Sequence, residues 1–134
     1  EVIKMKPTTY FSVFEPCEDG YSVYFPDLPG CISMGSDIKE AEKNAEEALG
    51  LHLWGMEEDN EEIPESTLPP FEDAETNCFI VPITVYMELV RNEMENKAVK
   101  KTLTIPYWLN EIAEKNKVNF SQVLQTALKE ILNV

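Results

Sequence analysis

The chain lacks the features of a membrane, secreted or disulfide-rich protein. No apolar run approaches the ~20 residues that a transmembrane helix needs, and the start of the sequence shows no secretory signal. Its three cysteines, Cys17, Cys31 and Cys78, are odd in number and widely spaced, so they predict neither a disulfide framework nor a CxxC metal site. We expect three reduced thiols in a cytoplasmic protein.

Arrangements that could carry catalysis are scarce as well. His52 is the only histidine, and it falls on the apolar stripe of a predicted helix, without a serine, cysteine or metal ligand spaced to act with it. A two-metal nuclease needs carboxylates that converge from the centres of strands, and the first predicted strand, Thr9–Phe14, carries none. We therefore expect no enzyme, no metal and no cofactor.

Positive charge is sparse and unevenly distributed. The chain has 11 Lys and Arg against 25 Asp and Glu, a net charge of −14. Residues 97–134 hold six basic and three acidic residues, a balance of +3, so residues 1–96, with five basic and 22 acidic residues, carry −17. Such asymmetry suggests two roles, in which the acidic part attracts a basic partner. On charge alone, the acidity could equally serve solubility.

Residues 8–34 predict three short strands. Thr8–Phe14 and Tyr21–Phe25 are rich in aromatic and β-branched residues, and the polar turn Glu15–Gly20 joins them into a hairpin. A rigid turn follows at Pro26–Gly30, where two prolines fix φ and a glycine permits positive φ. Cys31–Met34 is then a third strand.

A long helix is predicted next. Asp37 suits its N-cap, with Glu40 as the capping-box partner, and the helix should end near Glu57–Asp59. Trp54 lies off the apolar stripe, either as an exposed anchor for a partner or as a partly covered packing residue. The stripe is wide enough to cover a sheet and comprises Ala41, Ala45, Ala48, Leu49, His52, Leu53 and Met56.

The middle of the chain predicts a loop and a fourth strand. Asn60–Asn77 is acidic and contains prolines, which is typical of an extended loop. Cys78–Val85 is β-rich, and Pro82 favours an edge position or a bulge for this strand. Glu88–Asn96 is either a short helix or a linker, and it holds the domain boundary.

Val99–Pro106 predicts a strand with one apolar and one polar face. Its apolar residues share one parity: Val99, Leu103 and Ile105. Its polar residues share the other: Lys100, Thr102 and Thr104. A lone strand is not stable, so its simplest partner is the same strand of a second copy, and such a ribbon fits the DNA major groove.

Two helices follow this strand. The first covers about Tyr107–Lys115, and Asn116 is the residue of the next turn that best suits the left-handed C-cap position. Asn119 caps the second helix, with Gln122 at the capping-box position. The apolar face of the second helix is too wide for an isolated helix and predicts an obligate dimer. It comprises Phe120, Val123, Leu124, Ala127, Leu128 and Ile131.

The order strand, helix, turn, helix over residues 99–132 resembles the ribbon-helix-helix DNA-binding fold. In that family the polar face of the paired strands reads base edges, and the second helix grips a phosphate through its N-terminal backbone N–H groups. The resemblance implies base contacts by Lys100, Thr102 and Thr104. It implies phosphate contacts by Asn119, Phe120 and Ser121. The turn has Asn116 and Lys117 where the family often has glycine. A plain dimerisation domain remains the alternative, because a balance of +3 is modest for a phosphate-binding surface.

The first part of the chain resembles a second family. The run Phe25-Pro26-Asp27-Leu28-Pro29-Gly30-Cys31 follows the hairpin, Gly35-Ser36-Asp37 precedes the helix, and Ile63-Pro64-Glu65-Ser66 follows it. This pattern looks like the HicB antitoxin family, some members of which carry a C-terminal ribbon-helix-helix domain. The resemblance implies a partial RNase H-like β-β-β-α-β fold. It also implies inhibition of HicA, a small basic mRNA-cleaving toxin, and repression of the toxin–antitoxin operon.

These observations predict an α+β protein with a toxin-binding domain over 1–90, a linker over 91–98 and a ribbon-helix-helix domain over 99–134. We expect a homodimer, or a higher oligomer, of a non-enzymatic antitoxin that binds a HicA-like basic toxin and operator DNA. The resemblance leaves the toxin-contacting residues open. The alternative is a ribbon-helix-helix transcription regulator whose first domain senses a small ligand, without a toxin partner.

Overall fold

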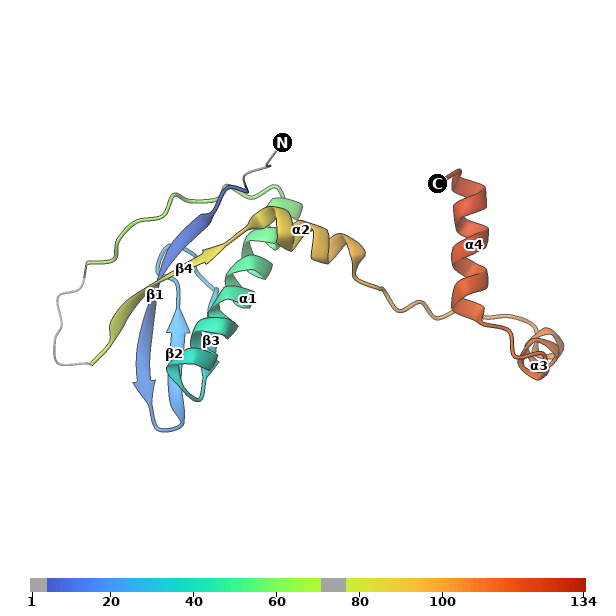
Figure 1. The fold of residues 1–134 in the computed structure, drawn as a ribbon, viewed down its shortest axis with the longest axis horizontal. Coiled ribbons are helices and arrows are strands. Elements are labelled where there is room, and N and C mark those ends of the chain that lie inside the picture. The colour runs from blue at the N-terminus through green and yellow to red at the C-terminus, as the bar shows by residue number, and fades with distance from the viewer. Residues whose placement is uncertain (1–4, 71–76) are drawn as a thin grey trace. The chain divides into compact units, whose positions relative to one another are not determined.

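The computed structural model describes residues 5–70 and 77–134, and Figure 1 shows its path. The chain divides into two compact units, the first ending at Lys97 and the second covering Ala98–Val134. The mixture of strands and helices confirms the predicted α+β class. The predicted loop Asn60–Asn77 includes residues 71–76, which lie outside the described residues.

A four-stranded antiparallel sheet forms the base of the first unit. Its spatial order is β3-β2-β1-β4, so β4 is an edge strand. This position agrees with the prediction from Pro82, because an edge strand can lack one ladder donor. The strands are β1 (Thr8–Cys17), β2 (Gly20–Tyr24), β3 (Ile32–Gly35) and β4 (Phe79–Val85).

The hairpin between β1 and β2 is tighter than the sequence predicted. Glu15 pairs with Ser22, and the pairing continues to Cys17 and Gly20, so the predicted turn Glu15–Gly20 is wrong and residues 18–19 alone connect the strands. Pro16 is tolerated here, since β4 pairs only with Thr8–Phe14 and leaves the end of β1 with a partner on one side. Two-residue turns match the twist of the strands they join.

The helix α1 (Ile38–Glu58) packs on one face of the sheet (Figure 1). The carboxylate of Asp37 accepts a hydrogen bond from the backbone N–H of Glu40 at 2.8 Å, which confirms the predicted N-cap. The side-chain amide of Asn44 donates to the backbone oxygen of Met34 at 2.8 Å and fixes the helix to β3.

The core of the first unit lies between α1 and the sheet. Ser12 is the buried polar residue among these side chains, and its hydroxyl donates to the backbone oxygen of Val81 at 2.7 Å, so its burial leaves no unsatisfied donor. The largest fully buried apolar side chains come from both layers and from the turn between them: Phe14, Phe25, Leu28, Leu49, Leu53 and Val23.

A second helix closes the first unit. α2 (Met87–Asn96) packs on α1, and Arg91 forms an ion pair with Glu57 at 2.7 Å. The helical alternative for Glu88–Asn96 is therefore confirmed. The predicted linker 91–98 is helical as far as Asn96, because Met87 and Val90 find apolar partners in the core of the first unit.

The second unit contains two helices, α3 (Tyr107–Lys115) and α4 (Phe120–Leu132). The residue in the left-handed conformation between them is Lys117, with φ of 53°, and the prediction of Asn116 is wrong. The reason is a two-bond C-terminal motif: the N–H of Val118 bonds to the oxygen of Ala113 at 3.1 Å, and that of Lys117 to the oxygen of Glu114 at 3.0 Å. This motif requires positive φ one residue after the helix cap.

Residues 97–106 carry neither helix nor strand in the single chain. The predicted strand Val99–Pro106 is therefore not formed here. A strand is stable only with a partner, and the partner that the sequence predicts is a second copy of the chain.

Candidate functional site

The start of α4 gathers three of the predicted site residues. The side-chain oxygen of Asn119 accepts a hydrogen bond from the backbone N–H of Gln122 at 3.1 Å, which confirms the predicted N-cap. Phe120 and Ser121 form the first turn of α4. Backbone N–H groups at a helix start lack intrahelical partners and suit an anion. Contact of these residues with DNA phosphate stays a prediction.

A mainly apolar groove of about 550 Å³ lies between residues 101–105 and the helices α3 and α4. From the predicted strand Lys101, Leu103 and Ile105 line the groove, together with α4 residues that include Phe120 and Val123. Lys100, Thr102 and Thr104 are exposed and do not line it. Within residues 100–105, those of one parity therefore line the groove and those of the other parity do not, as their alternation predicts. Contact of Lys100, Thr102 and Thr104 with bases stays a prediction.

The second unit leaves its apolar face uncovered. None of its residues is buried in the single chain, and Ile131 is 74% exposed. An apolar surface of this extent on a small unit is typical of a site of protein–protein interaction. The exposed apolar side chains come from the strand-like segment and from both helices: Leu103, Ile105, Leu109, Ile112, Phe120, Val123, Leu128 and Ile131.

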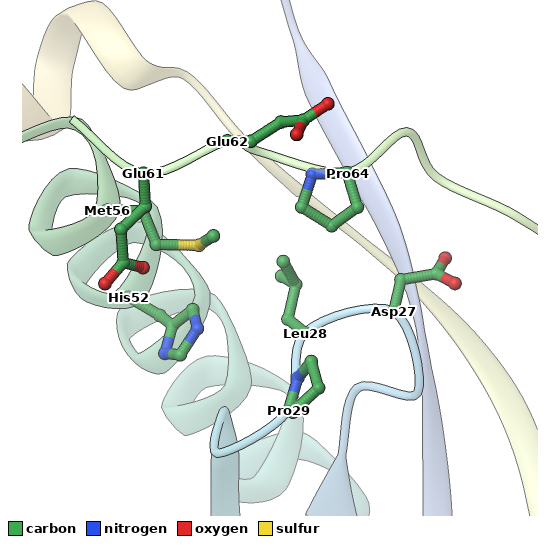
Figure 2. Close-up of a pocket in the computed structure, with 8 residues that line it drawn as sticks. All are labelled: Asp27, Leu28, Pro29, His52, Met56, Glu61, Glu62 and Pro64. Atoms are coloured by element: carbon green, nitrogen blue, oxygen red, sulfur yellow. The ribbon is translucent and has the colours of Figure 1, made fainter.

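The first unit contains an open pocket of about 620 Å³ (Figure 2). Three segments contribute to it, and Figure 2 shows their side chains around one opening. The turn after β2 provides Asp27, Leu28 and Pro29, α1 provides His52 and Met56, and the segment after α1 provides Glu61, Glu62 and Pro64.

Two hydrogen-bonding residues hold the segment after α1 across the pocket. The carboxylate of Asp27 accepts from the backbone N–H and from the hydroxyl of Thr67, both at 2.6 Å. The hydroxyl of Tyr10 donates to the backbone oxygen of Pro64. Burial, then the charges of Asp27 and Glu65, raise the pKa of Tyr10, so this donor stays protonated at neutral pH. The aspartate of the Phe-Pro-Asp-Leu-Pro-Gly-Cys run thus positions a distant segment.

The pocket has no hydroxyl or thiol nucleophile beside its histidine, because the described residues that line it include no serine, threonine or cysteine with the half-buried His52. In the part of the chain that the structure describes, no three His, Cys, Asp or Glu residues are grouped to hold a metal ion. Carboxylates around an apolar floor suit binding of a cationic or apolar group instead.

The remaining candidate residues are structural. The Cys31 thiol is buried, it donates to the oxygen of Ala48 at 3.7 Å, and burial raises its pKa to about 11, so it is a poor nucleophile. Trp54 packs against the core, which favours the packing alternative over the exposed anchor. None of the described helices is long and apolar enough to cross a membrane.

Comparison with known proteins gives consistent matches over most of the chain. Residues 10–127 match the family described as HicB_like antitoxin of bacterial toxin-antitoxin system. The chain is 37% identical over 125 residues to the "Uncharacterized 14.9 kDa protein in rep-hol intergenic region" of Haemophilus phage HP1, covering 84% of this chain and 90% of that protein.

Solved structures agree. The "Toxin-Antitoxin complex from Streptococcus pneumoniae" superposes with a TM-score of 0.57 at 27% identity, covering 93% of this chain and 99% of that one. The crystal structure of antitoxin HicB3 has the same fold, with a TM-score of 0.52 at 23% identity, covering 92% of this chain and 98% of that one.

An open pocket with carboxylates around an apolar floor and a helical unit with an uncovered apolar face are features of a binding protein. The family match defines that class further, because the protein is the antitoxin of a toxin–antitoxin system rather than an enzyme. The chain belongs to the HicB-like antitoxin family, which confirms the resemblance found in its sequence.

The sequence could not predict the hydrogen bonds of Asp27 to Thr67, because these residues are 40 positions apart. The only signal was the conspicuous proline–glycine run around Asp27, which marked a rigid turn without indicating what the turn holds.

Proposed function

We propose that this antitoxin acts in the cytoplasm, neutralises a small basic mRNA-cleaving toxin of the HicA type through its first unit, and represses its own operon through its second. The observation that carries the proposal is the charge division. Residues 1–96 carry −17 and residues 97–134 carry +3. The boundary between the two units falls one residue later, after Lys97, so the units carry −16 and +2.

The first unit is the proposed toxin-binding part, with an RNase H-like arrangement. Its acidity attracts a basic protein over long range and raises the rate of encounter. The similar structure from Streptococcus pneumoniae is a toxin–antitoxin complex, which supports a protein partner for this chain too.

The second unit is the proposed DNA-binding part, a ribbon-helix-helix homodimer. Its uncovered apolar face supports dimerisation, and pairing of residues 99–105 between two copies would complete the missing strand. Lys100, Thr102 and Thr104 would then face the bases, while Asn119, Phe120 and Ser121 would hold phosphates at the start of α4. Two ribbons can join dimers into a higher oligomer on a palindromic operator.

Co-expression with the product of the neighbouring reading frame tests the toxin arm. We expect a small basic protein to copurify with the chain, and we expect its cleavage of RNA to stop when the full chain is added. A neighbouring protein that neither binds the chain nor cleaves RNA would contradict this half of the proposal.

Fluorescence anisotropy with the promoter DNA of the same operon tests the DNA arm. We expect tight binding to the promoter, weak binding to shuffled DNA of the same composition, and an affinity that falls as salt rises, since phosphate contacts release counterions. Equal affinity for the two DNAs would contradict recognition of the operator and leave dimerisation as the role of the second unit.

A further inference from the structure

One face of the sheet in the first unit is not covered by a helix. α1 packs on the other face, and α2 packs on α1. Directly paired residues of antiparallel strands point to the same face. On the uncovered face these pairs are Ile32 with Tyr24, Tyr24 with Val13, and Val13 with Ile80. One apolar row therefore runs across all four strands.

This row, with its neighbours, forms an apolar patch that we call the open face. Ile32 and Met34 are each 70% exposed although both are large and apolar. Phe11 and Pro82 are paired and extend the patch along β1 and β4. Val13, in the middle of the row, is buried at 3% exposure, so the exposed part of the patch consists of the residues that flank it. An apolar patch of this kind on a protein surface is typical of a binding site.

The charged residues in the strands of the open face and in the hairpin turn are negative. Within the strands the only charged residue that points to this face is Glu15, which pairs with Ser22. Glu18 and Asp19 follow in the adjoining turn. Burial, then the charges of Glu15 and Cys78, raise the pKa of Tyr24, so the field of Glu15 reaches the centre of the row. No lysine or arginine lies in any of the four strands.

We infer that the open face is the surface on which the toxin docks, an inference that rests on the proposed function. The complementary partner surface has an apolar centre and a rim of lysine and arginine side chains. A second copy of this chain fits the face poorly, because each copy brings −17 over residues 1–96 and the rim charges would repel. The acidic rim and apolar centre together favour a basic protein.

Two substitutions at Ile32 test the inference in the full chain. Ile32→Lys removes an apolar contact and adds a charge that repels a basic partner, whereas Ile32→Glu removes the same contact but adds an attractive charge. Both should fold, since the side chain is 70% exposed. Leu89→Lys is the matched control, because Leu89 is 51% exposed and lies on α2, which packs on α1.

The measurement is the Kd of each full-length variant for the purified product of the neighbouring reading frame, by calorimetry at two salt concentrations. We expect Ile32→Lys to raise the Kd by roughly 30-fold or more, as at an interface hot spot, and Leu89→Lys to leave it within about threefold. Ile32→Glu should fall between them, and the difference between the two Ile32 variants should shrink at high salt.

Three outcomes would overturn the inference. If Ile32→Lys binds as the control does while the wild-type chain binds tightly, the toxin docks elsewhere and the proposed function survives. If the wild-type chain does not bind at all, the proposed function fails with the inference. If Ile32→Lys lowers the mass of the chain without partner in light scattering, the open face belongs to a second copy.

Discussion

Single residues fix the geometry of the first unit where backbone segments meet. A Cβ added at Gly35 would overlap the backbone of Ala41, and one added at Gly20 would overlap the backbone oxygen of Gly35. Gly35 thus allows β3 to approach the start of α1, and Gly20 allows the hairpin turn to approach β3. Gly55 in α1 has no atom within 4 Å of an added Cβ, so this glycine is dispensable for packing.

Gly35→Ala and Gly55→Ala should therefore change stability in opposite directions. We expect Gly35→Ala to lower the free energy of unfolding by about 1–3 kcal/mol through overpacking. Gly55→Ala should raise it by about 0.5–1 kcal/mol, because alanine is the better helix former. Urea denaturation of both variants checks this, and a stable Gly35→Ala variant would contradict the close approach of β3 and α1.

Asp27→Ala should loosen the segment that follows α1. The carboxylate of Asp27 accepts two hydrogen bonds from Thr67, and their loss should cost about 1–2 kcal/mol of stability. Limited proteolysis should then cleave within residues 60–70 faster than in the wild type. Thr67→Val keeps the backbone donor and removes only the hydroxyl, so it should have the smaller effect; equal effects would show that the hydroxyl alone matters.

Among the elements, those with local signals were predictable from the sequence. Asp37 and Asn119 predicted the starts of α1 and α4, because each is a residue type that favours the N-cap and has a capping-box residue three positions later. Both N-cap hydrogen bonds form as expected. The end of β1 was not predictable, because it depends on pairing with β2 rather than on Glu15 or Pro16 themselves. The turn at Lys117 likewise follows from which carbonyls remain unpaired at the end of α3.

We expect the strand predicted at Val99–Pro106 to form only when a second chain pairs with it. Val123 lines the apolar groove of the second unit and is exposed in the single chain. Val123→Glu should prevent dimerisation, because it would bury an unpaired charge in the interface. We expect its mass by light scattering to fall to that of a monomer and its affinity for the promoter to fall with it.

Gln125→Glu is the control for this variant, because it adds the same charge on α4 at an exposed position outside the groove. It should keep the mass of the wild type. A dimeric Val123→Glu variant would move the dimer contact away from α4.

For the whole molecule, composition indicated two segments of different charge but not the surfaces of either unit. The charge difference between residues 1–96 and 97–134 was visible in the sequence. The open face was not, because the strand register decides which side of β1 meets α1. The groove and the pocket were not visible either, because the residues that line each of them come from separate segments and follow no single helical or strand periodicity in the sequence.

Charge also couples the two proposed activities. The acidic residues 1–96 should repel DNA over long range, so a bound basic toxin should raise the affinity for the promoter until excess toxin rearranges the complex. Titration of toxin into the chain and labelled promoter should show this rise, and added salt should weaken it. An affinity that is unchanged at every ratio would disprove the electrostatic coupling.

The central claim is that toxin binding and DNA binding reside in separate units. It is tested most directly by the variant with Lys100→Ala, Thr102→Ala and Thr104→Ala, whose side chains are all exposed in the single chain. Promoter affinity and inhibition of the toxin's RNA cleavage should be measured on the same folded, dimeric preparation. The account predicts that promoter binding is lost while toxin inhibition equals that of the wild type. Loss of both activities, or retention of both, would contradict it.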